Sequence, residues 1–168
     1  EYGGRLDVLV NNAGTFSSWY VSTPDGFELQ LAVNHLAPFL LTGELMPLLK
    51  ASSSGRVITT SSGSHYRTRI NWKDIQLRKR YNSLLAYKRS KLANVLFTCE
   101  LNRRLGNGSS VRAFAVDPGL VNTCIGLKGT SGLVRWFWGI RSRRGVQPEQ
   151  AARTIIHLAG NPLEENED

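Results

Sequence analysis

The sequence predicts an α/β fold: a doubly wound parallel sheet of which this chain forms only the C-terminal portion. Three short apolar runs, at residues 6–10, 55–61 and 111–116, are each followed by turn-forming residues. A continuous apolar run that stops in this way is typical of a strand buried on both faces of a parallel sheet. Longer segments of helical periodicity separate the runs, and strands that alternate with helices favour parallel pairing.

Composition limits the possible function classes. The chain has 168 residues, of which 41% are hydrophobic, so it fits one globular domain with a sizeable core. It carries 21 basic and 13 acidic residues, a net charge of +8. Nucleic acid and anionic membranes are the usual partners of such a balance, but no nucleic-acid motif accompanies the basic residues. We therefore expect no nucleic-acid partner, and association with a membrane surface stays open.

The cysteines and the hydropathy pattern bear on metals and location. Cys99 and Cys124 have neither metal-ligand spacing nor a disulfide framework, so we expect no metal. No apolar run approaches the ~18 residues of a membrane-spanning helix, which indicates a cytoplasmic protein or one on the cytosolic face of a membrane. The chain opens on Glu1 just before the first predicted strand, so we expect a partial chain whose missing N-terminus could carry an anchor.

The first predicted strand ends in Asn11, Asn12, Ala13 and Gly14. Ala13 and Gly14 have almost no side chain, so a flat ligand could approach the backbone there. Either asparagine could tie neighbouring strands together through side-chain hydrogen bonds. A simple turn at the end of a strand is the alternative, because Asn and Gly favour turns.

The next segment predicts a distorted helix. Thr23 is the expected N-cap with Pro24 at the first helical position, and the helix should run to about Leu49. Asn34 lies in the middle, where Asn is a poor helix former. Its surroundings are apolar, and a buried Asn needs hydrogen-bond partners, although a solvent-facing side chain is the alternative. Pro38 follows four residues later and favours an irregular helix.

Ser62 follows the second predicted strand. The carboxyl ends of the strands in an open parallel sheet are where ligands bind, so Ser62 is a candidate for a site. A turn-forming serine is the alternative, and Ser61 or Ser64 could take its place. The Gly-x-Ser-x-Gly pattern of serine hydrolases is absent. Residues 65–82 form a long polar and basic loop, and loops of this length are often functional.

Tyr87 and Lys91 lie within a predicted helix over residues 83–105, which Asn82 or Ser83 could cap and Gly106 ends. They are four residues apart, so their side chains project from one face, one turn apart. A nearby cation favours the phenolate and lowers the pKa of a phenol from ~10, so the pair could transfer a proton. A surface tyrosine beside a basic stripe is the alternative, and for an isolated pair it is the commoner one.

The third predicted strand ends in Asp117, Pro118 and Gly119. Pro118 makes the turn rigid, and Gly119 lets the backbone approach a ligand. Residues 120–146 form a variable segment rich in aromatic and basic side chains. This composition favours a substrate lid, with a membrane-interface segment or a short packed helix as alternatives. A last helix is predicted over residues 147–160.

Five stretches, in this order, resemble the short-chain dehydrogenase/reductases. They are Asn11-Asn12-Ala13-Gly14, Asn34 within Val33-Asn34-His35, Ser61-Ser62, Tyr87-x-x-x-Lys91, and Asp117-Pro118-Gly119 with Thr123. The sequence is most similar to the retinol-dehydrogenase-like branch, and the resemblance covers nearly the whole chain. It implies a single partial Rossmann-type domain over residues 1–168. No Gly-x-x-x-Gly-x-Gly turn follows a strand here, so the resemblance implies the second half of the fold.

The resemblance also implies an oxidoreductase that moves hydride between a nicotinamide and a hydrophobic carbonyl or alcohol, of the retinoid, steroid or lipid-aldehyde class. Tyr87 would exchange a proton with the substrate oxygen, and Ser62 would hydrogen-bond that oxygen. Lys91 would lower the pKa of Tyr87 and hold the nicotinamide ribose. Asn34 would hold a water that links to Lys91.

The implied cofactor is NADP or NAD, with NADP favoured by the resemblance. Its adenosine half would border Asn11, Ala13 and Gly14. Its nicotinamide end would meet the turn at the end of the third strand, at Pro118, Gly119 and Thr123, in addition to Tyr87 and Lys91. A homodimer that pairs through the long helix is also implied. A non-catalytic interaction or regulatory module is the alternative function.

Overall fold

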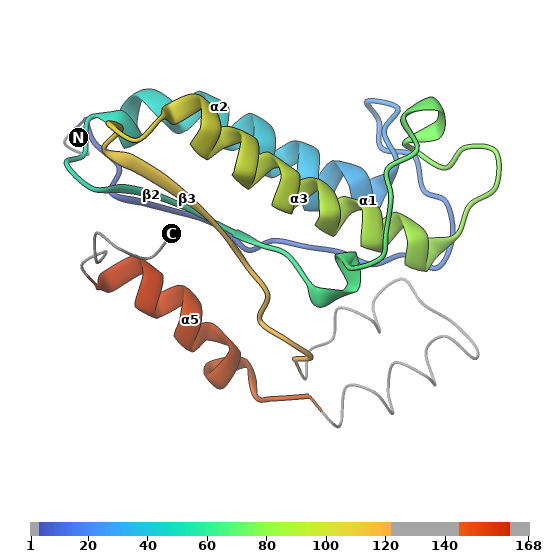
Figure 1. Cartoon of the computed structure of the whole chain (residues 1–168). Helices are drawn as coiled ribbons and strands as arrows, with labels where there is room; N and C mark the ends of the chain where they lie inside the picture. Colours follow the sequence, from blue (N-terminus) through green and yellow to red (C-terminus); the bar gives the residue numbers. More distant parts are fainter. Residues whose placement is uncertain (1–3, 122–144, 162–168) are drawn as a thin grey trace.

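The computed structural model describes residues 4–121 and 145–161, and a parallel sheet forms its centre (Figure 1). The strands are β1 (Val8–Asn11), β2 (Gly55–Thr60) and β3 (Val111–Val116), in the order β1-β2-β3. Both pairs are parallel, with Asn11 opposite Thr59 and Thr60 opposite Val116. All three strands therefore finish at the same edge of the sheet.

Helices cover both faces of this sheet, which confirms the doubly wound α/β prediction. α2 (Ala37–Lys50) and α3 (Ser83–Leu105) pack on one face, and α5 (Pro148–Gly160) lies on the other (Figure 1). The core between α2 and the sheet is apolar and tightly buried. Its buried members are Leu9, Leu49, Val57, Val111 and Ala113.

Burial is complete only in the central strand. Every residue of β2 is buried, as predicted. Val10 in β1 is 41% exposed, and Arg112 and Ala115 in β3 are exposed as well, so burial on both faces was a wrong prediction for the outer strands. For Val10 and Arg112, which point away from α2 and α3, the physical reason is that α5 is the one described helix on the opposite face, and its contacts with the sheet are mainly with β2.

The helix predicted to begin at Thr23 begins later. Thr23, Pro24 and Gly26 belong to a turn, in which the N–H of Gly26 donates to the carbonyl of Thr23 at 2.9 Å. Pro in the second position and Gly in the fourth suit a β-turn as well as they suit a helix start. The first helical residues are α1 (Leu29–Leu31), where the Glu28 carboxylate caps the N-terminus.

The distortion predicted around Asn34 is a π-helix, Ala32–Leu36, which leads directly into α2. Pro38 has no N–H, so the α-helical hydrogen bond to the carbonyl of Asn34 cannot form. That carbonyl accepts from the side chain of Asn94 in α3 instead, at 2.9 Å. The irregular turn therefore leaves the buried carbonyl of Asn34 to accept from a side chain of another helix.

The two remaining long helices agree with their predicted bounds. Asn82 caps α3 by accepting from the N–H of Leu85 at 2.9 Å, and Gly106 ends the helix with a φ of 73°. The loop before α3 contains two 3-10 helices, Gly63–His65 and Trp72–Asp74. Most of the predicted lid lies outside the described residues. Within the part that the structure describes, no helix has the length and apolarity needed to cross a membrane.

Candidate active site

Three predicted side chains from two separate segments meet at the carboxyl edge of the sheet. Ser62 follows β2, and its side chain lies close enough to the Tyr87 hydroxyl on α3 to lower the pKa of that group. The Nζ atom of Lys91, one turn further along α3, lies 5.7 Å from the centre of the Tyr87 ring. The structure thus brings a hydroxyl, a phenol and an amine to one place.

Lys91 is a buried amine, with 2% of the residue exposed. Its Nζ donates to the backbone carbonyl of Thr60 at 2.9 Å, at the end of β2. Burial lowers the pKa of Lys91 to about 8, and the negative charge of Asp117 opposes that change. A buried ammonium with such a pKa can release its proton near neutral pH.

Tyr87 has a pKa that differs from the expectation. Burial raises it, the hydrogen bond with Ser62 lowers it, and the charge of Asp117 raises it again. The net direction is upward, so the expected lowering by Lys91 does not govern the pKa of Tyr87 here. The reason is desolvation, since the phenolate would be enclosed by neighbours such as Phe16, whose ring meets that of Tyr87 edge to face at 5.8 Å.

Asn34 is buried, which excludes the solvent-facing alternative. Its Oδ1 accepts from the N–H of Thr15 at 2.7 Å, and its Nδ2 donates to the Thr15 carbonyl and to Ser90 Oγ, both at 3.0 Å. The side chain therefore ties the segment after β1 to α3. Its backbone carbonyl, and not its side chain, is turned toward the amide of Asn94.

Asn11 has a clear structural contact. Its Nδ2 donates to Thr42 Oγ1 in α2 at 3.0 Å and to Thr59 Oγ1 in β2 at 3.4 Å, so it ties β1 to its neighbours. Ala13 is exposed and Gly14 half-buried at the end of β1. The accessible part of this motif is therefore its small residues, while the buried Asn11 amide is occupied by protein partners.

The turn after β3 carries a carboxylate next to the site. Asp117 Oδ1 accepts from the N–H of Gly119 at 2.9 Å. The other oxygen, Oδ2, would lie only 2.8 Å from a Cβ added at Gly63, so the carboxylate rests against the backbone beside Ser62. Gly119 has a φ of 72° and open space where a side chain would be. Thr123 lies outside the described residues.

Comparison with known proteins assigns the family. A family model described as short chain dehydrogenase matches residues 1–130. The chain belongs to the short-chain dehydrogenase family. Retinol dehydrogenase 11 of Homo sapiens is 46% identical over 155 residues, which cover 92% of this chain and 48% of that protein. Retinol dehydrogenase 14 of Homo sapiens is 43% identical over 166 residues, covering 94% and 47%.

Solved structures support the same fold for this short-chain dehydrogenase. A crystal structure of an uncharacterised protein from Mycobacterium paratuberculosis is 39% identical with a TM-score of 0.70, covering 97% of this chain and 53% of that one. More distant structures of the same fold are complexed with NAD, at 19% identity, and with NADP+, at 20% identity. This dehydrogenase chain spans about half the length of the curated relatives it matches.

The carboxyl edge of the dehydrogenase sheet fits a flat cofactor. Ala13, Gly14 and Gly119 leave the ends of β1 and β3 free of large side chains, and nothing lies within 4 Å of a Cβ added at Gly119. Lys91 supplies a buried amine beside this edge. Among the described residues, no group of three or more His, Cys, Asp and Glu could hold a metal ion.

Two residues near the site escaped the sequence reasoning. Asn94 lies on α3 at positions i+3 from Lys91 and i+7 from Tyr87, so helical spacing would have placed it on the same face. Asp117 was assigned only to a turn, although its position after a strand placed it at the ligand edge. The helical spacing of Asn94 and the position of Asp117 after a strand can both be read from the sequence. Neither indicates a role in the site unless the residues that pack against these side chains are known.

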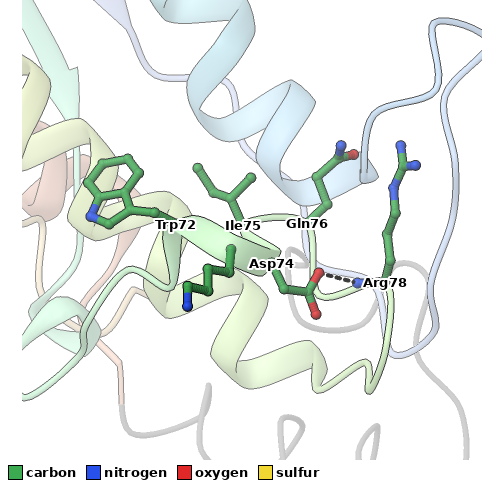
Figure 2. Close-up of a pocket in the computed structure, with 6 residues that line it drawn as sticks. Trp72, Asp74, Ile75, Gln76 and Arg78 are labelled. Carbon is green, nitrogen blue, oxygen red and sulfur yellow. Dashed lines mark hydrogen bonds between the residues drawn. The ribbon is translucent and has the colours of Figure 1, made fainter.

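The loop before α3 forms a hollow of about 260 Å³ that is separate from the candidate active site. Figure 2 shows the residues around it, including the exposed Trp72 and the bond from the N–H of Arg78 to Asp74 Oδ1 at 2.9 Å. Gln76 fixes the loop by accepting from the N–H of Glu28 at 2.9 Å. None of the residues lining the hollow belongs to the Ser62–Tyr87–Lys91 group.

Proposed function

We propose that this chain carries the catalytic part of an NAD(P)-dependent oxidoreductase, which transfers hydride between a nicotinamide and the carbonyl or alcohol carbon of a hydrophobic substrate. The single observation that carries the proposal is that Ser62, Tyr87 and Lys91 meet at one place, with the Ser62 hydroxyl close enough to the phenol to lower its pKa and the Lys91 amine 5.7 Å from the phenol ring. A hydroxyl and a phenol that lie together at a ligand edge can both reach one substrate oxygen.

The protein's own groups would handle the proton and the developing charge. In reduction, Tyr87 gives its proton to the carbonyl oxygen, and in oxidation it takes the proton of the alcohol. Ser62 donates a hydrogen bond to the same oxygen and stabilises its charge. Lys91 is the neighbouring positive charge that favours the phenolate when Tyr87 has given up its proton. The hydride itself is supplied or accepted by the nicotinamide.

The cofactor would lie along the carboxyl edge of the sheet. Ala13 and Gly14 would border its adenosine half, with Asn11 holding that strand end in place. Pro118, Gly119 and Thr123 would meet its nicotinamide end, and Lys91 would hold the ribose. NADP is favoured by resemblance to the retinol-dehydrogenase-like branch, and NAD is the alternative.

The substrate class and the setting are proposed from the relatives. The names of these relatives support a retinoid alcohol or aldehyde. The wider class of hydrophobic substrates, which includes steroids and lipid aldehydes, rests on the resemblance described above. We place the protein in the cytoplasm or on the cytosolic face of a membrane. A homodimer through α2 and α3 is supported by exposed apolar side chains on these helices, namely Phe39, Leu40, Leu41 and Leu96.

The test is turnover by the full-length protein with NADPH or NADH and a reactive hydrophobic aldehyde. Tyr87→Phe removes the proton donor and should lower kcat by roughly 10²- to 10⁴-fold, the usual contribution of general acid–base catalysis. Tyr66→Phe is the matched control, because Tyr66 is exposed on the loop and should leave kcat unchanged.

Survival of turnover within a few-fold in Tyr87→Phe would exclude Tyr87 as the proton donor. Titration with NADPH and NADH, followed by nicotinamide fluorescence, separates an enzyme from a non-catalytic module. Full-length protein that binds neither cofactor would favour the module.

A further inference from the structure

Asn94 is a buried amide in which every polar atom has a partner. It is 1% exposed on α3. Its Nδ2 donates to the backbone carbonyls of Asn34, at 2.9 Å, and Thr60, at 3.2 Å. Its Oδ1 lies 3.0 Å from the Nδ1 of His35. One side chain therefore joins the π-helix, the end of β2 and α3.

The orientation of this amide follows from its partners. Two carbonyl oxygens can only accept, so both protons of Nδ2 are used and Oδ1 must face His35. The Nδ1 of His35 then carries the proton and donates to Oδ1. Burial lowers the pKa of His35, although its hydrogen bond with Asn94 acts in the opposite direction. The lowered pKa keeps the ring neutral at pH 7.

The same two carbonyls matter to Lys91. The Thr60 carbonyl accepts from Lys91 Nζ at 2.9 Å as well as from Asn94, so the two side chains share one acceptor. The Asn34 carbonyl has no α-helical partner, because position 38 is proline. Without the Asn94 amide, the buried Asn34 carbonyl would lose this hydrogen bond, and the Thr60 carbonyl would keep Lys91 as its side-chain donor.

We infer that Asn94 is a positioning residue of the proposed reaction. Its amide holds the Thr60 carbonyl, which in turn orients Lys91 toward the site. The same amide ties the end of β2 to the π-helix through the Asn34 carbonyl. This inference rests on the oxidoreductase function proposed above. Asn94 touches neither substrate nor cofactor in this scheme and acts through Lys91. Within residues 4–121 and 145–161, the charged and titratable groups around Lys91 are Asp117 at the end of β3, Tyr87 on α3, and His35, which lies on the far side of Asn94.

The experiment compares two asparagines of the same helix in the full-length protein. Asn102 also bonds to backbone, since it donates to the Ala113 carbonyl at 2.9 Å and accepts from its N–H at 2.8 Å, but it is remote from Lys91. Asn94→Leu should lower kcat by roughly ten- to a hundredfold, the effect of a small misplacement of a catalytic group. Asn102→Leu should destabilise the fold and leave kcat of the folded enzyme within about twofold, because the catalytic groups stay in position.

The pH profile supplies a readout that a purely structural role would not move. Asn94→Leu leaves Lys91 as the side-chain donor to the Thr60 carbonyl, which favours the ammonium, so the pKa of Lys91 and the change in kcat/KM that follows its titration should move to higher pH. Asn102→Leu should leave that pH dependence in place. Equal losses of kcat in Asn94→Leu and Asn102→Leu, or an unmoved pH dependence in Asn94→Leu, would overturn the inference.

Tyr87→Phe, measured in the same series, keeps the two hypotheses apart. If Tyr87→Phe loses turnover while Asn94→Leu behaves like Asn102→Leu, only the role of Asn94 is wrong. If Tyr87→Phe keeps turnover, the proposed function itself is wrong.

Discussion

Replacing Lys91 with methionine should stabilise the cofactor-free protein at neutral pH, although it removes a group proposed for catalysis. Methionine has nearly the length of the lysine stem and a similar helix propensity, so α3 should tolerate the change. What it removes is a charge enclosed by protein, with 2% of the residue exposed. The effect on the free energy of unfolding can therefore be worked out from the pKa of the amine.

The magnitude follows from that pKa. Lowering of the pKa of Lys91 from 10.5 to about 8 means that the ammonium is disfavoured in the folded state. A difference of about 2.5 in pKa corresponds to about 3 kcal/mol at pH 7. Methionine also loses the bond to the Thr60 carbonyl, which contributes about 1 kcal/mol. We expect Lys91→Met to raise the free energy of unfolding at pH 7 by about 2 kcal/mol.

The pH dependence has a definite sign. Below the folded-state pKa of about 8, Lys91 is protonated in both states and its contribution is constant. Between about 8 and 10.5, the unfolded state holds the proton that the folded state has released, so the stability of the wild type rises with pH. From pH 7 to pH 9.5 the wild type should gain about 2 kcal/mol relative to Lys91→Met.

The assay is urea denaturation of the cofactor-free full-length protein at pH 7 and pH 9.5. Lys88→Met on the same helix is the control, since Lys88 is only half-buried and its loss should change stability by less than about 0.5 kcal/mol. A Lys91→Met protein that is less stable than the wild type at pH 7, with the same difference at pH 9.5, would refute the reasoning.

Three further predictions concern charge, the helix start and the core. Asp117→Asn should shift the rise of kcat/KM for alcohol oxidation to lower pH, because the carboxylate raises the pKa of both Tyr87 and Lys91; an unshifted pH profile would contradict this. Glu28→Ala removes the cap of α1 and should lower the free energy of unfolding by about 1–2 kcal/mol in urea denaturation. Leu49→Ala empties a fully buried site and should lower it by about 3 kcal/mol; a loss below about 1 kcal/mol would mean that the core closes around the gap.

Local patterns predicted most of the fold because the physics that fixes it is local. The apolar runs gave the three strands, and Asn82 and Gly106 gave the bounds of α3. The start of the first helix was wrong because Thr23 opens a segment that fits a turn and a helix equally well. Glu28 caps the observed start of the helix. Its backbone N–H donates to the side chain of Gln76, which lies 48 positions away in the sequence.

The candidate site was likewise predicted only in part from the sequence. Tyr87 and Lys91 could be paired by helical spacing, and Ser62 could be placed at the ligand edge by the rule for parallel sheets. The direction of the Tyr87 pKa could not be predicted, because burial depends on which segments pack over the ring. Asn94 escaped notice because its proposed role depends on the Asn34 carbonyl in the π-helix, which lacks its α-helical partner because position 38 is proline. Sequence spacing does not reveal that contact.

The environment disfavours the charged forms of both Lys91 and Tyr87, the two ionisable groups of the proposed reaction. Burial lowers the pKa of Lys91 and raises that of Tyr87, so the site resists forming an ammonium and a phenolate together. Ser62 favours the phenolate and Asp117 favours the ammonium, and each acts on the group that desolvation opposes. A buried amine that serves the proposed reaction costs the fold stability, which is why the methionine variant should be more stable and less active.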